Sequence, residues 1–157
     1  MGFVFMKIQK TTDLEKEDIE KDDLYNETQK HKNDVFRIMS LFAFELMETG
    51  YKHDWTKEAY FDDFYNDTVE RKFNRNFKER KWYKIHTEKE RHHLHAKVPK
   101  DIDLVDVIEY ISDSVAAGLS RSGRVEKKYL EISGEDLKKA YWNTIDKLIE
   151  ELEVENE

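Results

Sequence analysis

Turn-forming residues are scarce in this chain, and this scarcity limits the folds that it can adopt. One proline, Pro99, and five glycines are spread over 157 residues, whereas a β-rich fold needs many tight turns built from such residues. Apolar residues recur instead at every third or fourth position, which is the period of an amphipathic helix. We therefore expect an all-α fold, and the length corresponds to a single domain.

A long helix is predicted near the start of the chain. The helical spacing covers about 26–48, where the apolar stripe includes Val35 and Met39. Gly50 follows this stretch and is expected to stop the helix. His31 lies one turn before Val35 on the same stripe, so its side chain is expected to point inward.

Later helices are predicted from capping signals as well as from periodicity. Thr56 is a candidate cap for the helix that follows it. Thr87 and Glu90 match a capping box, which predicts a helix start at this point. Between these signals, residues 66–84 are expected to form a basic and aromatic amphipathic helix.

The two ends of the chain are expected to differ from its centre. Residues 1–25 are expected to form a charged N-terminal arm or helix, with a short extended stretch over 3–8. Residues 26–157 are expected to form the helical domain, which a C-terminal amphipathic helix after Ser133 completes. The apolar stripe of that helix consists of Leu137, Tyr141, Ile145, Leu148 and Leu152.

The charge balance and the absence of special segments exclude several classes of protein. A net charge of −8 opposes general binding to nucleic acid backbones. The basic and aromatic stretch 66–84 has the composition of a single-strand binding surface, but an amphipathic helix with its rings inside is the favoured interpretation. The chain has no apolar run of about 18 residues that predicts a membrane helix, no recognisable signal peptide and no cysteine for disulfides. We expect a cytoplasmic protein.

Histidine is the residue type that points to chemistry in this chain. There are six histidines, and most of them stand within a few residues of an acid. Imidazole and carboxylate are the side chains that bind divalent metals without sulfur. The adjacent pair His53-Asp54 anchors this pattern, whereas His95 is expected at the surface. The other candidates are His31, His86, His92, His93 and Asp113.

A helix expected over 104–120, capped by Asp101 or Asp103, carries an acidic face. At about 100° per residue, its acids fall on one side, nearly opposite an aliphatic sector. A solvated face and a face that borders a cation explain this pattern equally well. The acids concerned are Asp106, Glu109 and Asp113.

The order of these residues resembles that of the HD superfamily of metal-dependent phosphohydrolases, which are all-helical enzymes named for an adjacent His-Asp pair. The resemblance covers about residues 26–120. The segment from His53 to Lys57 is similar to a His-Asp-x-x-Lys variant in which the lysine faces the substrate phosphate. The chain also resembles a small uncharacterised family of phages and their bacterial hosts, which has a histidine, this variant and a double histidine in the same order.

The resemblance implies an HD-like helical bundle that binds one or two divalent ions of Mn, Fe, Mg, Co or Zn. It implies that Asp54 and Lys57 are catalytic, and that Lys57 and His92 contact the substrate. Asp106 and Glu109 are rivals for the position of the last metal ligand. The implied metal ligands are His31, His53, Asp54, His86, His93 and Asp113.

Two functions remain open at this point. The resemblance implies a metal-dependent phosphohydrolase that acts on a nucleotide or another small phosphate ester, and Arg121 is a candidate for holding the phosphate. The alternative is a non-catalytic helical accessory protein that binds a protein partner, with or without a structural metal. The C-terminal helix is a candidate for self-association. If the protein is phage-encoded, it is expected in the host cytoplasm.

Overall fold

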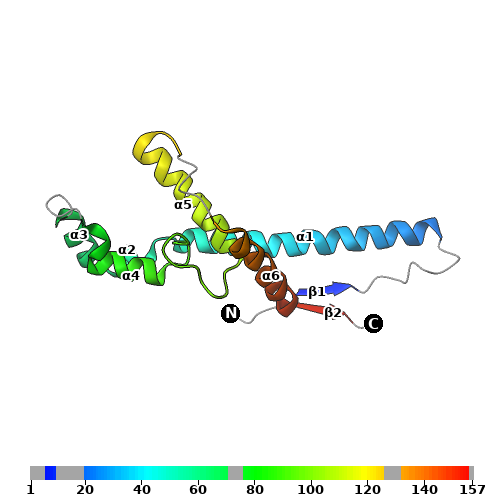
Figure 1. Ribbon diagram of the computed structural model, residues 1–157. Coiled ribbons are helices and arrows are strands. Elements are labelled where there is room, and N and C mark those ends of the chain that lie inside the picture. The colour runs from blue at the N-terminus through cyan, green and yellow to red at the C-terminus, as the bar shows by residue number, and fades with distance from the viewer. Residues whose placement is uncertain (1–5, 10–19, 71–75, 126–131, 156–157) are drawn as a thin grey trace. The chain divides into compact units, whose positions relative to one another are not determined.

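Helices make up most of the regular structure in the computed structural model (Figure 1). The structure describes residues 6–9, 20–70, 76–125 and 132–155. The chain divides into two compact units, one formed by Met1–Glu45 with Thr144–Glu157 and the other by Leu46–Asn143. The expected all-α class is confirmed. None of the described helices is both long enough and apolar enough to cross a membrane.

Two short strands pair in the first unit. β1 (Met6–Gln9) lies parallel to β2 (Leu152–Glu155), with Met6 opposite Leu152. The described part of the extended stretch expected over 3–8 is therefore a strand. Leu152 was expected in the apolar stripe of the last helix, and that expectation is wrong because the helix ends one residue earlier.

Parts of two helices complete the first unit. They are the N-terminal part of α1 (Lys21–Lys52) and the C-terminal end of α6 (Gly134–Glu151). The Nζ atom of Lys147 lies 2.9 Å from Oε1 of Glu45 and links the two helices. The helix end predicted at Gly50 is wrong, because α1 continues through this glycine and ends at Lys52.

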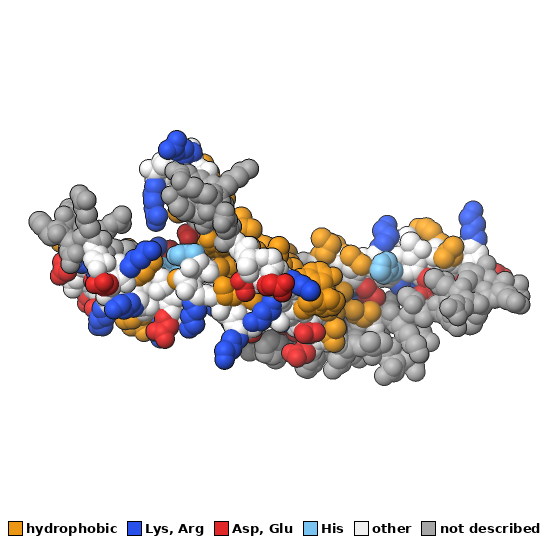
Figure 2. All heavy atoms as spheres, in the orientation of Figure 1, with side chains coloured by type: hydrophobic (Ala, Val, Ile, Leu, Met, Phe, Trp, Pro, Cys, Tyr) orange, Lys and Arg blue, Asp and Glu red, His pale blue; other side chains and the backbone are white. Residues whose placement is uncertain are grey.

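The apolar stripe of α1 is not the buried face that the sequence predicts. Val35 is 41% exposed and Met39 is 66% exposed, whereas α1 buries Glu27 and Asp34. Exposed hydrophobic side chains are visible in Figure 2. Helical periodicity identified the helix but did not identify the side that packs. The charged arm expected over 1–25 lies largely outside the described residues, and α1 already begins within it.

The second unit contains the remaining helices. The single amphipathic helix predicted over 66–84 is wrong, because one helix ends at Glu70 and another begins at Lys81. In the later helix, the backbone N–H of Trp82 donates to Oδ2 of Asp67, 3.0 Å away. The elements are α2 (Trp55–Ala59), α3 (Phe61–Glu70), η1 (Phe77–Glu79), α4 (Lys81–Lys89) and α5 (Leu104–Ser122).

The capping box predicted at Thr87 and Glu90 is wrong. Thr87 lies in the last turn of α4, and its hydroxyl donates backward to the carbonyl of Tyr83, 2.9 Å away. Glu90 is the C-cap of this helix. The same residue types therefore mark a helix end here, because the threonine bonds to the preceding turn and not to the following one.

The segment between α4 and α5 packs into the core of the second unit. Leu94 and Ile102 from this segment join Val107 and Tyr110 of α5 and Ala140 of α6 in one buried cluster. These contacts hold an irregular connection in place, so the side chains that it carries have defined positions.

An ion pair fixes this connection to the start of α5. Asp103 is the N-cap of α5 and forms a capping box with Asp106. Of the two caps predicted for this helix, Asp101 and Asp103, the second is confirmed. Asp106 is 4% exposed and accepts two hydrogen bonds of 2.7 Å from the guanidinium of Arg91. Paired hydrogen bonds between arginine and carboxylate are strong and directional. Arg91 immediately precedes His92 and His93, so this ion pair anchors the chain directly before both histidines.

Replacing Asp106 by alanine is expected to lower the free energy of unfolding by about 2 kcal/mol, because a buried charged hydrogen bond is lost. Asp101→Ala is the matched control, since Asp101 contacts the same arginine at 3.2 Å but its side chain is 78% exposed. Its effect is expected to stay below about 0.5 kcal/mol. Urea unfolding followed by circular dichroism measures both. Equal effects would contradict the assignment of this role to Asp106.

Candidate metal centre

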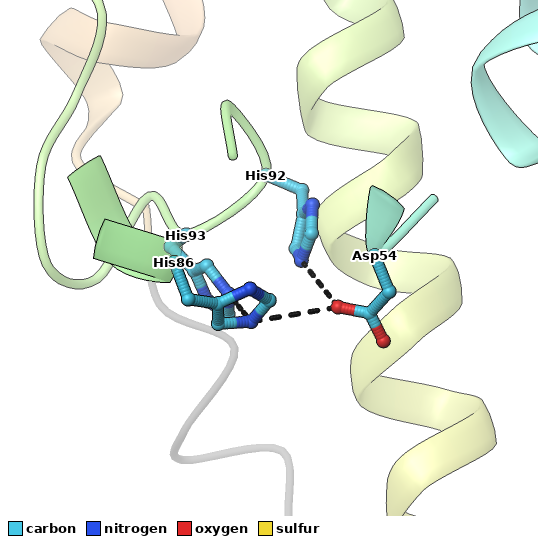
Figure 3. A group of neighbouring side chains, drawn as sticks. All are labelled: Asp54, His86, His92 and His93. Atoms are coloured by element: carbon cyan, nitrogen blue, oxygen red, sulfur yellow. Dashed lines mark hydrogen bonds and ion pairs between the residues drawn. The ribbon is translucent and has the colours of Figure 1, made fainter. Parts of the chain in front are cut away.

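Four side chains from three parts of the second unit converge on one point (Figure 3). Asp54 precedes α2, His86 lies on α4, and His92 and His93 follow α4 in the segment fixed by Arg91. One potential ligand atom from each residue lies within 4.8 Å of the others. We call these four residues the primary group. His86 and His92 are 4% and 1% exposed, whereas Asp54 and His93 are partly buried.

The backbone at Asp54 has an unusual conformation that directs its carboxylate. Its φ of 61° and ψ of 22° are left-handed, and it is the only non-glycine residue with positive φ among the described residues. Its side chain makes no capping hydrogen bond. Oδ1 lies 3.4 Å from Nε2 of His86, while Oδ2 contacts Nζ of Lys57 and lies 3.4 Å from Nε2 of His53. Such backbone strain is common at functional sites.

A chain of hydrogen bonds determines which nitrogen of His86 carries the proton. The hydroxyl of Thr56 donates to Oε1 of Glu90, 2.8 Å away, and lies 2.6 Å from Nδ1 of His86. A hydroxyl has one hydrogen, so Nδ1 of His86 must donate to Thr56. Nε2 therefore carries the lone pair and faces the primary group. Metal-binding histidines are commonly oriented through their second nitrogen in this way.

His86 and His93 are both neutral near pH 7. Burial lowers the pKa of His86 to about 4, and burial with the neighbouring histidines lowers the pKa of His93 to about 3. Their Nε2 atoms lie 2.6 Å apart. Trp82 stacks on His86 with 4.6 Å between ring centroids and shields it from solvent. Two neutral imidazoles that face each other can ligate a metal ion without first losing a proton.

His92 is buried without the hydrogen bonds that a buried imidazole needs. Neither ring nitrogen makes a hydrogen bond of good geometry with a described residue. Nδ1 lies 3.1 Å from Oε1 of Glu109, and Nε2 lies 4.0 Å from Oδ1 of Asp54. Unsatisfied buried nitrogens are costly. A metal ion in the primary group would satisfy Nε2, so this observation supports a metal site independently of the convergence of ligands.

His53, His92 and Glu109 form a second group of potential ligands, which shares His92 with the first. Nδ1 of His53 lies 2.9 Å from Oε1 of Glu109, and Nε2 lies 3.5 Å from Oδ1 of Asp113. The carboxylates of Asp113 and Glu109 raise the pKa of His53 to about 10. His53 is therefore an imidazolium near pH 7, so it must lose a proton before it can bind metal.

Glu109 of this second group and the neighbouring Asp113 both remain charged. Burial would raise the pKa of Glu109, but interactions with His53 and His92 lower it to about 2. The hydrogen bond to His53 also lowers the pKa of Asp113. The acidic face of α5 is thus not simply solvated. Glu109 and Asp113 face histidines, whereas Asp106 faces Arg91, so Asp106 is not a rival for the last ligand.

One protein family matches most of the chain, including the site. The model of DUF5662, described as a family of unknown function, matches residues 20–153. The chain belongs to DUF5662. The matched region contains both groups of potential ligands. No curated protein and no solved structure matches the chain. The resemblance of this DUF5662 protein to the HD superfamily therefore stays a prediction.

Asp113 and Lys57 belong to neither group, although they contact His53 and Asp54, respectively. Two further candidates are also outside both groups. His31 is exposed on α1 in the first unit, so the expectation that it points inward is wrong. The reason is that its stripe is not buried, as the exposure of Val35 shows. Arg121 is exposed in the last turn of α5, about two helical turns beyond Asp113. Neither residue contributes to the ligand groups in the described part of the chain.

The structure brings most of the other predicted metal ligands together, but it buries one residue that was expected to contact the substrate. His53, Asp54, His86 and His93 lie in the two groups. His92, expected to contact substrate, is too deeply buried for an open substrate surface. His95 is exposed as expected.

Sequence reasoning missed the two residues that orient His86. Thr56 was expected to cap α2, but the N-cap is Asp54. Thr56 is instead fully buried and bonded to Glu90 through both its hydroxyl and its backbone N–H. The available signal was the position of Thr56 just after the His53-Asp54 pair. This signal did not indicate that its partner would be Glu90, which is distant in the sequence.

The donors of the primary group suit some metals better than others. Three imidazoles and one carboxylate favour zinc, iron or cobalt over magnesium, which prefers oxygen ligands. The buried nitrogens of His92 and the fixed lone pair of His86 fit such an ion. The cluster of the DUF5662 protein can therefore hold a divalent metal, which is the coarser part of the expectation from the sequence.

Replacing Thr56 by valine is expected to weaken zinc binding about 10–100-fold, because His86 loses the acceptor that orients it. Thr56→Ser keeps the hydroxyl and is expected to bind zinc with nearly wild-type affinity. Competition with a chromophoric chelator measures both affinities, and circular dichroism checks that each variant is folded. A folded valine variant with wild-type affinity would show that Thr56 does not orient a ligand.

Proposed function

We propose that this DUF5662 protein is a metal-dependent phosphohydrolase that acts on a nucleotide or another small phosphate ester. The observation that carries the proposal is the primary group, in which three histidines and Asp54 converge beside the side chain of Lys57. The resemblance of the His53-Asp54 pair and Lys57 to the HD pattern supports the same chemistry.

Asp54, His86, His92 and His93 would hold the ion. A bound divalent ion supplies a Lewis acid that neutralises phosphate charge and makes water more acidic. The protein contributes ligands that are already oriented, since Glu90 acts through Thr56 to direct the lone pair of His86. Burial of these ligands keeps bulk water away, which strengthens electrostatic interactions inside the site.

Two cations lie beside the carboxylate of Asp54. Lys57 contacts Oδ2, and 36% of its side chain is exposed, so this lysine is partly open to an incoming phosphate. His53 is also charged near pH 7 and lies 3.4 Å from the same oxygen. We assign to Lys57 the binding of a phosphate oxygen and to His53 the positioning of Asp54.

A second candidate function is that of a non-catalytic accessory protein that binds a protein partner. The exposed hydrophobic side chains of α1 favour it, since Phe36 is 71% exposed and Met47 is 74% exposed. A structural metal in the primary group is compatible with this function. Cytoplasmic location, self-association through the C-terminal helix and weak binding to nucleic acid stay predictions.

Lys57→Ala is expected to retain metal but to lose about 10²–10³ in the rate of phosphate release, because a charged contact in the transition state is removed. The assay measures phosphate released from mononucleotides, cyclic nucleotides and nucleotide polyphosphates, with zinc, manganese, iron, cobalt or magnesium. Lys52→Ala is the control, since Lys52 pairs with Glu48 on the surface of α1.

Loss of metal in the Lys57 variant would mean that the lysine supports the fold of the site. Equal rates in both variants would remove Lys57 from the mechanism. A wild-type protein that binds metal but hydrolyses no phosphate ester would favour the accessory function.

Asp54→Asn is expected to reduce metal occupancy strongly without a large loss of stability. Asparagine tolerates the left-handed backbone at this position, but it lacks the charge that attracts a divalent ion. Metal analysis after gel filtration and thermal unfolding measure the two effects. Asp54→Ala also removes the carboxylate, but alanine tolerates the left-handed backbone less well than asparagine does, so asparagine is the better test. Full metal occupancy in the asparagine variant would exclude Asp54 as a charged ligand.

A further inference from the structure

A cavity of about 330 Å³ lies beside the second group of potential ligands, between the end of α1 and α5. Leu46 from α1 and Ile108 and Ala116 from α5 give it apolar walls. An apolar cavity of roughly 150 Å³ can hold a benzene molecule. This cavity is therefore large enough for an aromatic ring with substituents.

The charges around the cavity restrict what can enter it. Glu109 and Asp113 line it, together with His53, which is already paired with both of them. No lysine or arginine is among its described lining residues. The two carboxylates outnumber the single lining residue that can carry a positive charge, so an anionic group is disfavoured whatever the protonation state of His53. The hydroxyl-bearing side chains of Thr49 and Ser112 also line the cavity.

His53 links the cavity to the primary group, although none of the four residues of that group lines the cavity. This residue lines the cavity, and its Nε2 atom lies 3.4 Å from Oδ2 of Asp54. Its ring also lies 4.4 Å from the ring of His92, measured between centroids. A molecule with its phosphate at Asp54 would therefore have this cavity one residue away, on the far side of His53.

We propose that this cavity binds the organic group of the phosphate ester, and that this group is uncharged, largely apolar and about the size of an aromatic ring. The inference rests on the proposed function and makes it more specific. It favours a phosphomonoester of an aromatic or similarly apolar alcohol. It disfavours esters whose organic group carries a carboxylate or further phosphates.

Three non-hydrolysable phosphonates test the proposal on the zinc-loaded full-length protein. Calorimetry compares phenylphosphonate, methylphosphonate and phosphonoacetate, which differ in apolar area and in charge. Burial of a phenyl ring is expected to make phenylphosphonate bind at least about tenfold more tightly than methylphosphonate. Phosphonoacetate is expected to bind no more tightly than methylphosphonate, because its carboxylate would face Glu109 and Asp113.

Ala116→Phe fills the cavity and is expected to abolish the preference for phenylphosphonate while leaving methylphosphonate binding and zinc content unchanged. Ser120→Phe is the control, because Ser120 is similarly exposed on the same helix but is not among the lining residues. Ser112→Leu, at another lining position, serves the same purpose if the Ala116 variant does not fold.

The possible outcomes separate this inference from the proposed function. Equal affinity for the three phosphonates, tighter binding of phosphonoacetate, or an unchanged preference in a folded cavity-filling variant would overturn the inference alone. A preference for phenylphosphonate without release of phosphate from phenyl phosphate would support the cavity but contradict the phosphohydrolase. Failure to bind zinc or any phosphonate would overturn both.

Discussion

The hydrogen-bonded chain from Glu90 through Thr56 to His86 is the interaction on which the site depends. All three residues are buried, so each polar atom needs a partner inside the protein. The chain directs one nitrogen of His86 to Thr56 and leaves the other facing Asp54 and His93. It also joins α2 to α4, so the fold of these helices and the direction of a ligand are determined together.

Opposite electrostatic environments divide the histidines into two kinds. Burial keeps His86 neutral despite the nearby carboxylate of Asp54, and it keeps His93 neutral as well. Asp113 and Glu109 instead hold His53 in its charged form. The neutral histidines can accept a metal ion directly. The charged one stabilises the carboxylates around it. His92 lies between the two groups and is the most deeply buried, so a change in either group affects the other.

Local signals in the sequence predicted some features, and contacts between distant residues determined the others. Periodicity and a capping aspartate located α5, since both signals lie within the helix itself. The pattern of histidines and acids predicted that His53, Asp54 and His86 act together, and the structure brings them together. The position of His31 was not predictable, because the face of α1 that packs depends on the rest of the fold. Thr56 was misassigned as a helix cap because its partner, Glu90, is distant in the sequence.

The central claim is that three histidines and one carboxylate bind a single divalent ion in the primary group. X-ray absorption at the zinc edge, measured on the zinc-loaded wild-type protein, tests it most directly because it reports the type and number of ligands. The account predicts three imidazole nitrogens and at least one oxygen at distances of about 2.0–2.2 Å. A zinc site with fewer than two imidazoles, or a protein that retains no zinc, would contradict it.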